Sequence, residues 1–292
     1  MIMNRSLVDM HMHSTASDGT DDPKLLVEKV RAAGIRVFAL TDHDTIAGLD
    51  EISGNLSGGI RFVPGIEFSC ISEAGRCHIL GYNCDTAHSA FRETLEEGVR
   101  LRRVKLTKRL DYLRDVCHVP ITDAEREEFF RMKSVGKPHL AKFLISKGMA
   151  TSIWEAIDRY INPSGTEDSR LPSEMVVRAI LASGGVPVWA HPLGGEGERR
   201  LGREEFDAGL RYLLACGLRG LECFYSRYTE NEIAGLLDAA GESHLLVSGG
   251  SDYHGKNKNI EMGTLNAGLR PVNPEKLTLL KELGIRVPWN SV

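Results

Sequence analysis

Short apolar runs and helical patterns alternate along most of the chain. Runs of about four to eight residues rich in valine, isoleucine and leucine are typical of buried strands. Such runs predict strands at 7–13, 37–40, 61–68, 78–82, 186–190, 220–224 and 245–248. Between them, apolar residues at helical spacing predict helices that include 22–34, 173–182, 203–215 and 229–240. This alternation predicts parallel crossovers and an α/β fold, and the seven strand candidates suit a closed barrel better than an open sheet.

Residues 99–168 break this alternation, because they are rich in helical pattern and contain no clear strand. We predict that they form an inserted small helical domain, and that 1–98 and 169–292 form the barrel domain. The insertion begins with a basic run that consists of Arg100, Arg102, Arg103, Lys105, Lys108 and Arg109. We interpret this run as a solvated helix face, with the alternative that part of it faces an anionic substrate.

The composition is that of an ordinary globular protein, with 42% hydrophobic and 26% charged residues among 292. Lys and Arg total 36 against 40 Asp and Glu, so the formal charge of −4 argues against duplex nucleic acid as a partner. The six cysteines include no C-x-x-C pair and predict reduced thiols. We find neither a leader peptide nor an apolar run near the roughly 18 residues of a membrane span, and we expect a soluble, cytoplasmic protein.

The segment Asp9-Met10-His11-Met12-His13 carries the first candidate chemistry. A strand has a period of two, so Asp9, His11 and His13 share one face while the two methionines face apolar packing. Two imidazoles at this spacing can converge on one cation. By itself, an H-x-H pair also occurs by chance on surface strands.

Similar polar residues stand at the ends of most other predicted strands. They are Asp18, His43, Glu67, His78, His191, Asp252 and His254. In a parallel α/β barrel the carboxyl ends of all strands open onto one face, where active sites are built. Together with His11 and His13, these residues include six of the ten histidines, and we expect all nine to meet in one pocket.

The type of ligand narrows the choice of metal. Imidazole and carboxylate without thiolate favour Zn, Fe or Mn over Ca or Mg. A catalytic ion commonly keeps about three protein ligands, so nine candidates predict two or three divalent transition metals with bridging carboxylates. Such ions lower the pKa of bound water to about 7 and hold the attacking and leaving oxygens of a phosphoryl group. The same ligands could serve amide cleavage, so these residues alone leave the reaction class open.

Six short motifs occur in the order of a known family. They are His11-Met12-His13, Ser17-Asp18-Gly19, Thr41-Asp42-His43-Asp44, Gly65-Ile66-Glu67, Ala190-His191-Pro192 and Ser251-Asp252-Tyr253-His254. This order resembles the PHP (polymerase and histidinol phosphatase) superfamily over almost the whole barrel. The resemblance implies a distorted (β/α)7 barrel, a di- or trinuclear metal centre and hydrolysis of phosphoesters. It also implies that the inserted residues form a lid over the metals, as in the most similar subgroup.

The resemblance assigns the nine ligands to three sub-sites. The first takes His11, His13, Glu67 and Asp252; the second shares Glu67 and takes His78 and His191; the third takes Asp18, His43 and His254. The third sub-site is assigned the catalytic activation of metal-bound water or of the leaving group. Every ligand position of the family is filled, which implies an active enzyme.

Further residues near the same edge are candidate contacts to the substrate. They are Lys137, His139, Arg170, Tyr225 and Arg227. A cation such as Lys137 supplies charge for a substrate phosphate remote from the metals. Asp9 and Asp42 are expected to orient neighbouring imidazoles rather than to bind metal. The histidines expected to be structural are His88, His118 and His244.

We favour a phosphoesterase that hydrolyses 5-phosphoribosyl 1,2-cyclic phosphate at both ester bonds, which yields ribose 5-phosphate and phosphate. The alternative is a 3',5'-bisphosphate nucleotide phosphatase or an oligoribonucleotide 5'-3' exonuclease. Either enzyme would need an aromatic or apolar side-chain surface on which a base can stack. An amidohydrolase is less favoured, because those enzymes commonly add a bridging lysine that is not found at these strand ends. A metal-stabilised binding or regulatory module is disfavoured by the complete ligand set. The expected partner is a small phosphorylated substrate, without a membrane, and no oligomeric state is assigned.

Overall fold

The sheet at the centre of the molecule is built from short buried strands. The computed structural model describes residues 5–288 except 54, 55, 57, 58, 74, 133, 167, 168, 197 and 198. In this part of the chain the strands are β1 (Val8–Asp9), β2 (Val37–Leu40), β3 (Arg61–Ser72), β4 (Gly75–Tyr82), β5 (Leu171–Pro172), β6 (Val186–Ala190), β7 (Gly220–Tyr225) and β8 (Leu246–Gly250).

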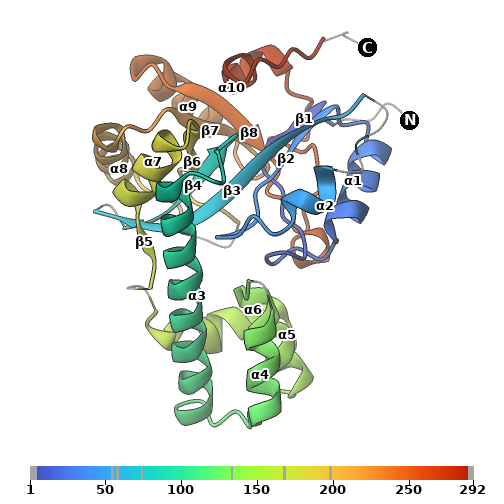
Figure 1. Cartoon of the computed structure of the whole chain (residues 1–292), viewed down its shortest axis with the longest axis vertical. Coiled ribbons are helices and arrows are strands. Elements are labelled where there is room, and N and C mark those ends of the chain that lie inside the picture. Colours follow the sequence, from blue (N-terminus) through green and yellow to red (C-terminus); the bar gives the residue numbers. More distant parts are fainter. Residues whose placement is uncertain are drawn as a thin grey trace.

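The strands wrap into a nearly closed barrel. Their order is β1-β2-β3-β4-β6-β7-β8, and β5 adds to β3 outside this path. Where the first and last strands meet, the Met10 amide donates to the Gly249 carbonyl and the Asp252 amide donates to the His11 carbonyl. Figure 1 shows the helices around the outside of this sheet. The predicted α/β barrel of seven strands with an added helical segment is confirmed.

β4 runs antiparallel to both of its neighbours, so the prediction of parallel crossovers is wrong at this strand. Only residues 73 and 74 separate β3 from β4, and a parallel pair needs a connection of roughly a dozen residues or more. The reversal puts the amino end of β4 beside the carboxyl ends of the parallel strands. His78 therefore pairs with Ser69 of β3 on one side and with Ala190 of β6 on the other.

The first strand is much shorter than the predicted 7–13. Beyond Asp9 the backbone leaves the ladder, and Met12 returns only as an isolated parallel bridge to Tyr253. The Asp9 carboxylate accepts hydrogen bonds from the amides of Ser251 and Gly263, which a neighbouring strand would otherwise bind through its carbonyls. This side chain fixes the path of the chain just before His11.

The helices that cover the barrel lie between successive strands, apart from the last one, which follows β8. They are α1 (Pro23–Ala32), α2 (Leu49–Ser53), α7 (Ser173–Ala182), α8 (Arg203–Cys216), α9 (Glu230–Glu242) and α10 (Thr278–Glu282). At α1, the Asp22 carboxylate accepts from the amides of Lys24 and Leu25, and Pro23 occupies the first helical position. At α9, Thr229 and Glu232 form a reciprocal capping box.

A separate group of helices is connected to the barrel by one long helix. This group contains α3 (Ser89–Asp115), α4 (Asp123–Arg131), α5 (Lys137–Ser146), α6 (Ile153–Ala156), a π-helical turn (Ile157–Ile161) and a 3-10 turn (Asn162–Ser164). It has an apolar cluster of its own around Leu110, Phe129 and Leu144. The 27 residues of α3 run unbroken from the barrel into this group (Figure 1). Because α3 begins at Ser89, residue 99 lies inside it, and the division at 99–168 stays a prediction.

None of the described helices is both long and apolar enough to cross a lipid bilayer. All six cysteines are unpaired, and Cys70, Cys77 and Cys223 are buried.

Candidate metal centre

One edge of the barrel gathers the nine residues that the sequence singled out as ligands. His11 and His13 follow β1, His43 follows β2, Glu67 lies within β3, and His191 follows β6 directly. Asp252 and His254 follow β8, and Asp18 lies in the turn after His13. Four groups of these side chains have ligand atoms within 4.8 Å of one another: His13, Asp18, His43 and His254; His11, Glu67 and His191; His11, His13 and Asp252; and His43, Glu67 and His78.

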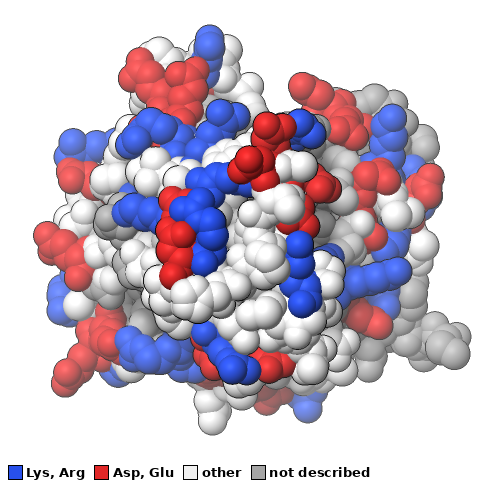
Figure 2. Space-filling view, turned by 90° about the horizontal axis from the view of Figure 1, so that it is seen from below, with Lys and Arg blue, Asp and Glu red and all other residues white. Residues whose placement is uncertain are grey.

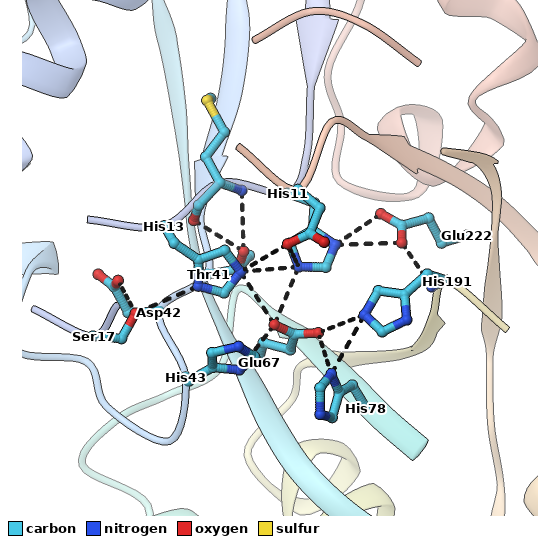
Figure 3. A network of polar contacts seen from close by, with 12 residues as sticks. His11, His13, Ser17, Thr41, Asp42, His43, Glu67, His78, His191 and Glu222 are labelled. Carbon is cyan, nitrogen blue, oxygen red and sulfur yellow. Dashed lines mark hydrogen bonds and ion pairs between the residues drawn. The ribbon is translucent and has the colours of Figure 1, made fainter. Parts of the chain in front are cut away.

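Glu67 lies at the middle of the cluster (Figure 3). Its Oε2 is 3.2 Å from His11 Nε2, 3.1 Å from His13 Nε2 and 3.0 Å from His43 Nδ1. Its Oε1 is 3.0 Å from His78 Nδ1 and 3.1 Å from His191 Nε2. The side chain is fully buried. A carboxylate with imidazoles on both oxygens has the geometry of a ligand that bridges two ions.

Asp18 is the centre of the outer part of the cluster. Its Oδ1 lies 3.2 Å from His254 Nε2 and 4.0 Å from His43 Nε2. The side chains of Asp18 and His43 are 10% and 13% exposed, whereas those of His11, His13 and Glu67 are not exposed at all. This part of the cluster therefore borders the cavity that leads to the centre.

The donor atoms fit divalent metal ions better than they fit one another. Glu67 Oε2 and His43 Nδ1 are buried and have no hydrogen-bond partner in the described part of the chain. A buried polar atom without a partner costs about 1–3 kcal/mol, which coordination to a cation would recover. The donors are nitrogen and oxygen without thiolate, the set that suits Zn, Mn or Fe.

Burial and the neighbouring charges shift the pKa values of this cluster. Burial opposes ionisation of Glu67, but His43, His11 and His78 outweigh it and hold the pKa of this carboxyl well below its ordinary range. Burial lowers the pKa of His43 and of His254, so both imidazoles are neutral near pH 7. At His13, the neighbouring carboxylates of Asp252 and Glu67 overcome burial and raise the pKa to about 9. An ion bound by this imidazole would have to displace a proton from it.

Glu222 is a residue of this centre that the sequence analysis missed. It lies on β7, is fully buried, and its Oε1 is 3.0 Å from His11 Nδ1. Its Oε2 accepts a hydrogen bond from the His191 amide at 2.7 Å. A lone carboxylate within the otherwise apolar segment Gly-Leu-Glu-Cys-Phe-Tyr was the available signal.

The two aspartates that were expected to orient imidazoles behave differently from that expectation. Asp9 contacts backbone amides, including that of His11 at 3.3 Å, and no imidazole in the described residues. Asp42 reaches an imidazole only through Ser17. It accepts a hydrogen bond from the Ser17 hydroxyl at 2.6 Å, and that hydroxyl lies 3.4 Å from His13 Nδ1. The direct partner of a ligand imidazole is Glu222, as in other metal sites with a carboxylate behind the histidine.

Asp252 has its two oxygens in different surroundings. Oδ1 faces His13 Nε2 at 3.4 Å, whereas Oδ2 accepts from the Tyr225 hydroxyl and the Lys258 ammonium. Tyr225 is fully buried and also accepts from the Glu196 amide. The structure thus places Tyr225 behind Asp252 rather than in the cavity, because its hydroxyl is used by Asp252 and Glu196. Lys258, which the sequence analysis did not name, lines the cavity.

The other candidate substrate contacts are divided between the cavity and its surroundings. Lys137 and Arg170 line the cavity, and Arg170 Nη1 lies 3.4 Å from His78 Nε2. His139 Nδ1 accepts from the Gly136 amide at the start of α5, so this imidazole caps the helix. Arg227 is held by Glu196 and by the Asn259 carbonyl. The histidines that were expected to be structural lie at helix ends: His88 precedes α3, His118 follows α3, and His244 follows α9.

The cavity that leads to the centre has a volume of about 510 Å³ and is bounded by the barrel edge and the helical group. Lys105 and Arg109 of α3 line it and are only 9% and 8% exposed. The interpretation of the whole basic run as a solvated face is therefore wrong for these two residues, which are buried against the cavity instead. Elsewhere on this end of the molecule, basic and acidic residues are interspersed (Figure 2).

The family model of the PHP domain matches residues 9–162, which is more than half of the 292-residue chain. The chain therefore belongs to the PHP family, as the six motifs predicted.

Three similar proteins define the class more closely. A 5'-3' exoribonuclease from Haemophilus influenzae is 31% identical over 265 residues, which cover 87% of this chain and 92% of the relative. A phosphoribosyl 1,2-cyclic phosphate 1,2-diphosphodiesterase from Eggerthella lenta is 31% identical over 259 residues, 85% of this chain and 94% of the relative. A solved structure from Bifidobacterium adolescentis, described as a metal-dependent phosphoesterase, aligns with a TM-score of 0.73 at 30% identity and covers 90% of this chain and 93% of that one.

This chain is a metal-dependent phosphoesterase, a hydrolase of phosphoric ester bonds. The predicted family and enzyme class are confirmed, which sets aside amide cleavage and a purely structural role.

Proposed function

We propose that this chain hydrolyses the phosphoester of a nucleotide or of a short RNA end, with two or three Mn, Fe or Zn ions held by the nine ligands. His11, His13, Glu67 and Asp252 would hold the first ion, Glu67 with His78 and His191 the second, and Asp18, His43 and His254 the third. The proposal is supported by the position of Glu67, whose two oxygens face different imidazoles. When bound, such ions activate water and neutralise charge on the phosphoryl group.

The protein's own residues then orient the reacting groups. Glu222 holds His11 and the backbone of His191, which fixes two imidazoles on opposite sides of Glu67. Asp18, His43 and His254 border the cavity, and His43 and His254 are neutral because burial lowers their pKa values. We assign to these three residues the activation of water or of the leaving group. Lys137 and Arg170 are proposed to contact substrate phosphate from the cavity wall.

Trp154 is the observation that favours a substrate with a base. Its residue is 72% exposed, although indole is among the side chains that gain most from burial. It lines the same cavity as His78 and Asp252, together with Ile153 and Ile157. Stacking of a base on an aromatic side chain contributes roughly 1–3 kcal/mol. The exposed indole offers the stacking surface that the base of a nucleotide substrate needs, and a ribose phosphate without a base would not use it.

The second candidate is 5-phosphoribosyl 1,2-cyclic phosphate, hydrolysed at both ester bonds to ribose 5-phosphate and phosphate. It is supported by the similarity to the Eggerthella lenta relative and by the basic lining of the cavity, which includes Arg102, Lys105 and Arg109. A compact sugar phosphate would use these cations without reaching Trp154.

Hydrolysis assays with metal-loaded enzyme test the proposal, by release of phosphate from the bisphosphate and the cyclic phosphate and by release of mononucleotides from the RNA. The panel contains adenosine 3',5'-bisphosphate, a short 5'-phosphorylated RNA and the cyclic ribose phosphate. We expect Trp154→Ala to raise KM for the first two by about 5- to 150-fold, the equivalent of the stacking energy. Val116→Ala, which truncates another exposed apolar residue of the helical group, is the control. Turnover of the cyclic phosphate alone would support the second candidate, and no turnover of any of the three would contradict both.

A further inference from the structure

Two candidate ligands at the cavity are contacted by the helical group as well as by the barrel. The hydroxyl of Ser134, in the link between α4 and α5, donates a hydrogen bond to the main-chain carbonyl of His43 at 3.1 Å. Ser134 is only 5% exposed. Two residues further, the backbone of Gly136 lies against Asp18, and a Cβ added to this glycine would be 2.6 Å from Asp18 Oδ2. The link therefore packs directly on two of the three residues assigned to the third sub-site.

Arg102 of α3 holds the residue that follows His43. Its Nε donates to Asp44 Oδ2 at 2.7 Å, and its Nη2 donates to Ser69 Oγ at 3.2 Å. Its Nη1 donates to the Val135 carbonyl at 3.3 Å, so one guanidinium joins the barrel to the link between α4 and α5. The side chains of Arg102 and Asp44 are only 14% and 3% exposed. Because a guanidinium presents several donors in a fixed plane, it can hold three acceptors at once.

Asp44 connects this contact to the strand that carries Glu67. Its amide donates to the Glu67 carbonyl at 2.9 Å, and its Oδ1 accepts from the Ser69 amide at 2.8 Å. Its backbone is left-handed, with a φ of 49°. This conformation costs energy for a residue other than glycine and persists only where surrounding contacts hold it. Arg102 supplies one of these contacts from the helical group.

We propose that Ser134 and Arg102 are positioning residues for the third sub-site. They hold the backbone at His43 and at the residue after it. This keeps the His43 ring between two carboxylates, with Nδ1 at 3.0 Å from Glu67 Oε2 and Nε2 at 4.0 Å from Asp18 Oδ1. The inference rests on the proposed function and deepens it, because it makes the third ion depend on contacts with the helical group.

The first two sub-sites are held differently. Glu222 of β7 contacts the His11 ring and accepts from the His191 amide, so these two imidazoles are positioned from within the barrel. Loss of a contact from the helical group should therefore weaken one ion and leave the others in place. Coupling of this kind is reciprocal, so an ion in the third sub-site should in turn stabilise the packing of the helical group on the barrel.

The experiment uses full-length enzyme saturated with Mn²⁺ and the substitutions Ser134→Ala and Arg102→Lys. Lysine keeps the charge but cannot donate to three acceptors in one plane, so this variant tests geometry rather than charge. The number of ions per chain is measured by elemental analysis after dialysis against graded chelator. We expect three ions in the wild-type enzyme. In each variant one ion should bind about 10- to 100-fold more weakly, the usual effect of losing a partner behind a ligand, while the other two are retained as in wild type.

Three further variants complete the test. Ser134→Thr keeps the hydroxyl and should retain the third ion. Ser146→Ala and Arg114→Lys are matched controls in the helical group and should retain all ions as in wild type. Ser146 also donates to a main-chain carbonyl, and Arg114 also pairs with an aspartate, but both side chains are exposed.

Metal retention does not depend on turnover, so it tests the positioning role even if no phosphoester is hydrolysed. Thermal unfolding of the metal-free proteins checks that every variant is folded. Equal weakening of all ions, unchanged retention in Ser134→Ala or in Arg102→Lys, or a wild-type enzyme that holds only two ions would overturn the proposal.

Discussion

The carboxylate of Glu222 lies 3.0 Å from Nδ1 of His11, although 211 positions separate the two residues. The contact crosses from β7 to the end of β1 and leaves Nε2 of His11 directed at Glu67. It fixes which ring nitrogen is available as a ligand. A carboxylate behind a ligand imidazole also raises its basicity and holds the ring in place.

Glu222→Gln is expected to weaken metal binding about 10- to 100-fold with little change in fold, because the amide keeps the shape but loses the charge behind His11. The measurement is metal content by elemental analysis after dialysis against graded chelator. Glu232→Gln, at an exposed helix cap, is the control. Unchanged metal retention in Glu222→Gln would show that the contact is only structural.

Gly250→Ala is expected to disrupt the centre through sterics alone. An added Cβ would lie 2.2 Å from the Cβ of His11 and 2.6 Å from its amide nitrogen, so backbone must shift. Such overpacking costs roughly 1–3 kcal/mol and should lower both Tm and metal content. In contrast, Gly235→Ala meets nothing within 4 Å in the interior of α9 and should stabilise the protein by up to about 1 kcal/mol. Similar Tm values for the two variants would contradict this prediction.

Lys105 is expected to make stability depend on pH. Its pKa falls from the ordinary 10.5 to about 6 on folding, so the unfolded chain binds more protons between these values. The free energy of unfolding should therefore fall as pH is lowered from about 10.5 to about 6, by at most about 1.4 kcal/mol per unit from this group. Lys105→Met should remove this contribution, so its advantage over wild type grows toward pH 6. Urea unfolding at several pH values measures it, and parallel pH profiles would refute it.

Tyr225→Phe distinguishes a residue that positions Asp252 from one that binds substrate. The substitution removes the hydroxyl that donates to Asp252 Oδ2 at 3.1 Å. Loss of one hydrogen bond to a charged group should weaken metal retention by about tenfold or more. With metal in excess, KM should stay close to the wild-type value. A raised KM at full metal occupancy would instead indicate direct contact with substrate.

Much of the centre was predictable because strand ends in a barrel share one edge. His43, His191 and Asp252 each follow an apolar strand, so sequence order alone placed them together. His78 was predicted for the right edge although β4 runs antiparallel, because it lies in the amino-terminal half of its strand, beside Ala190 at the carboxyl end of β6. The direction of β4 follows from the short connection before it, which strand periodicity does not report.

What the sequence did not reveal depends on contacts between distant segments. Glu222 faces His11 only because closure of the barrel brings β7 close to β1, with β8 between them, and a single carboxylate in a strand does not predict that. The burial of Tyr225 has the same origin, since Asp252 and Glu196 reach it from other loops. The basic run on α3 had a helical period, but which side meets the barrel depends on how the helix packs.

Because α3 is one continuous helix, we expect it to move as a single unit. With 27 residues it measures about 40 Å, so a tilt of roughly 5° at its base would carry its far end by about 3 Å. Lys105 and Arg109 would travel with it, whereas the ligands stay on the barrel. The distance between these two cations and the candidate ligands on the barrel is therefore set by one angle, that between α3 and the barrel, and a tilt of the helix would alter it.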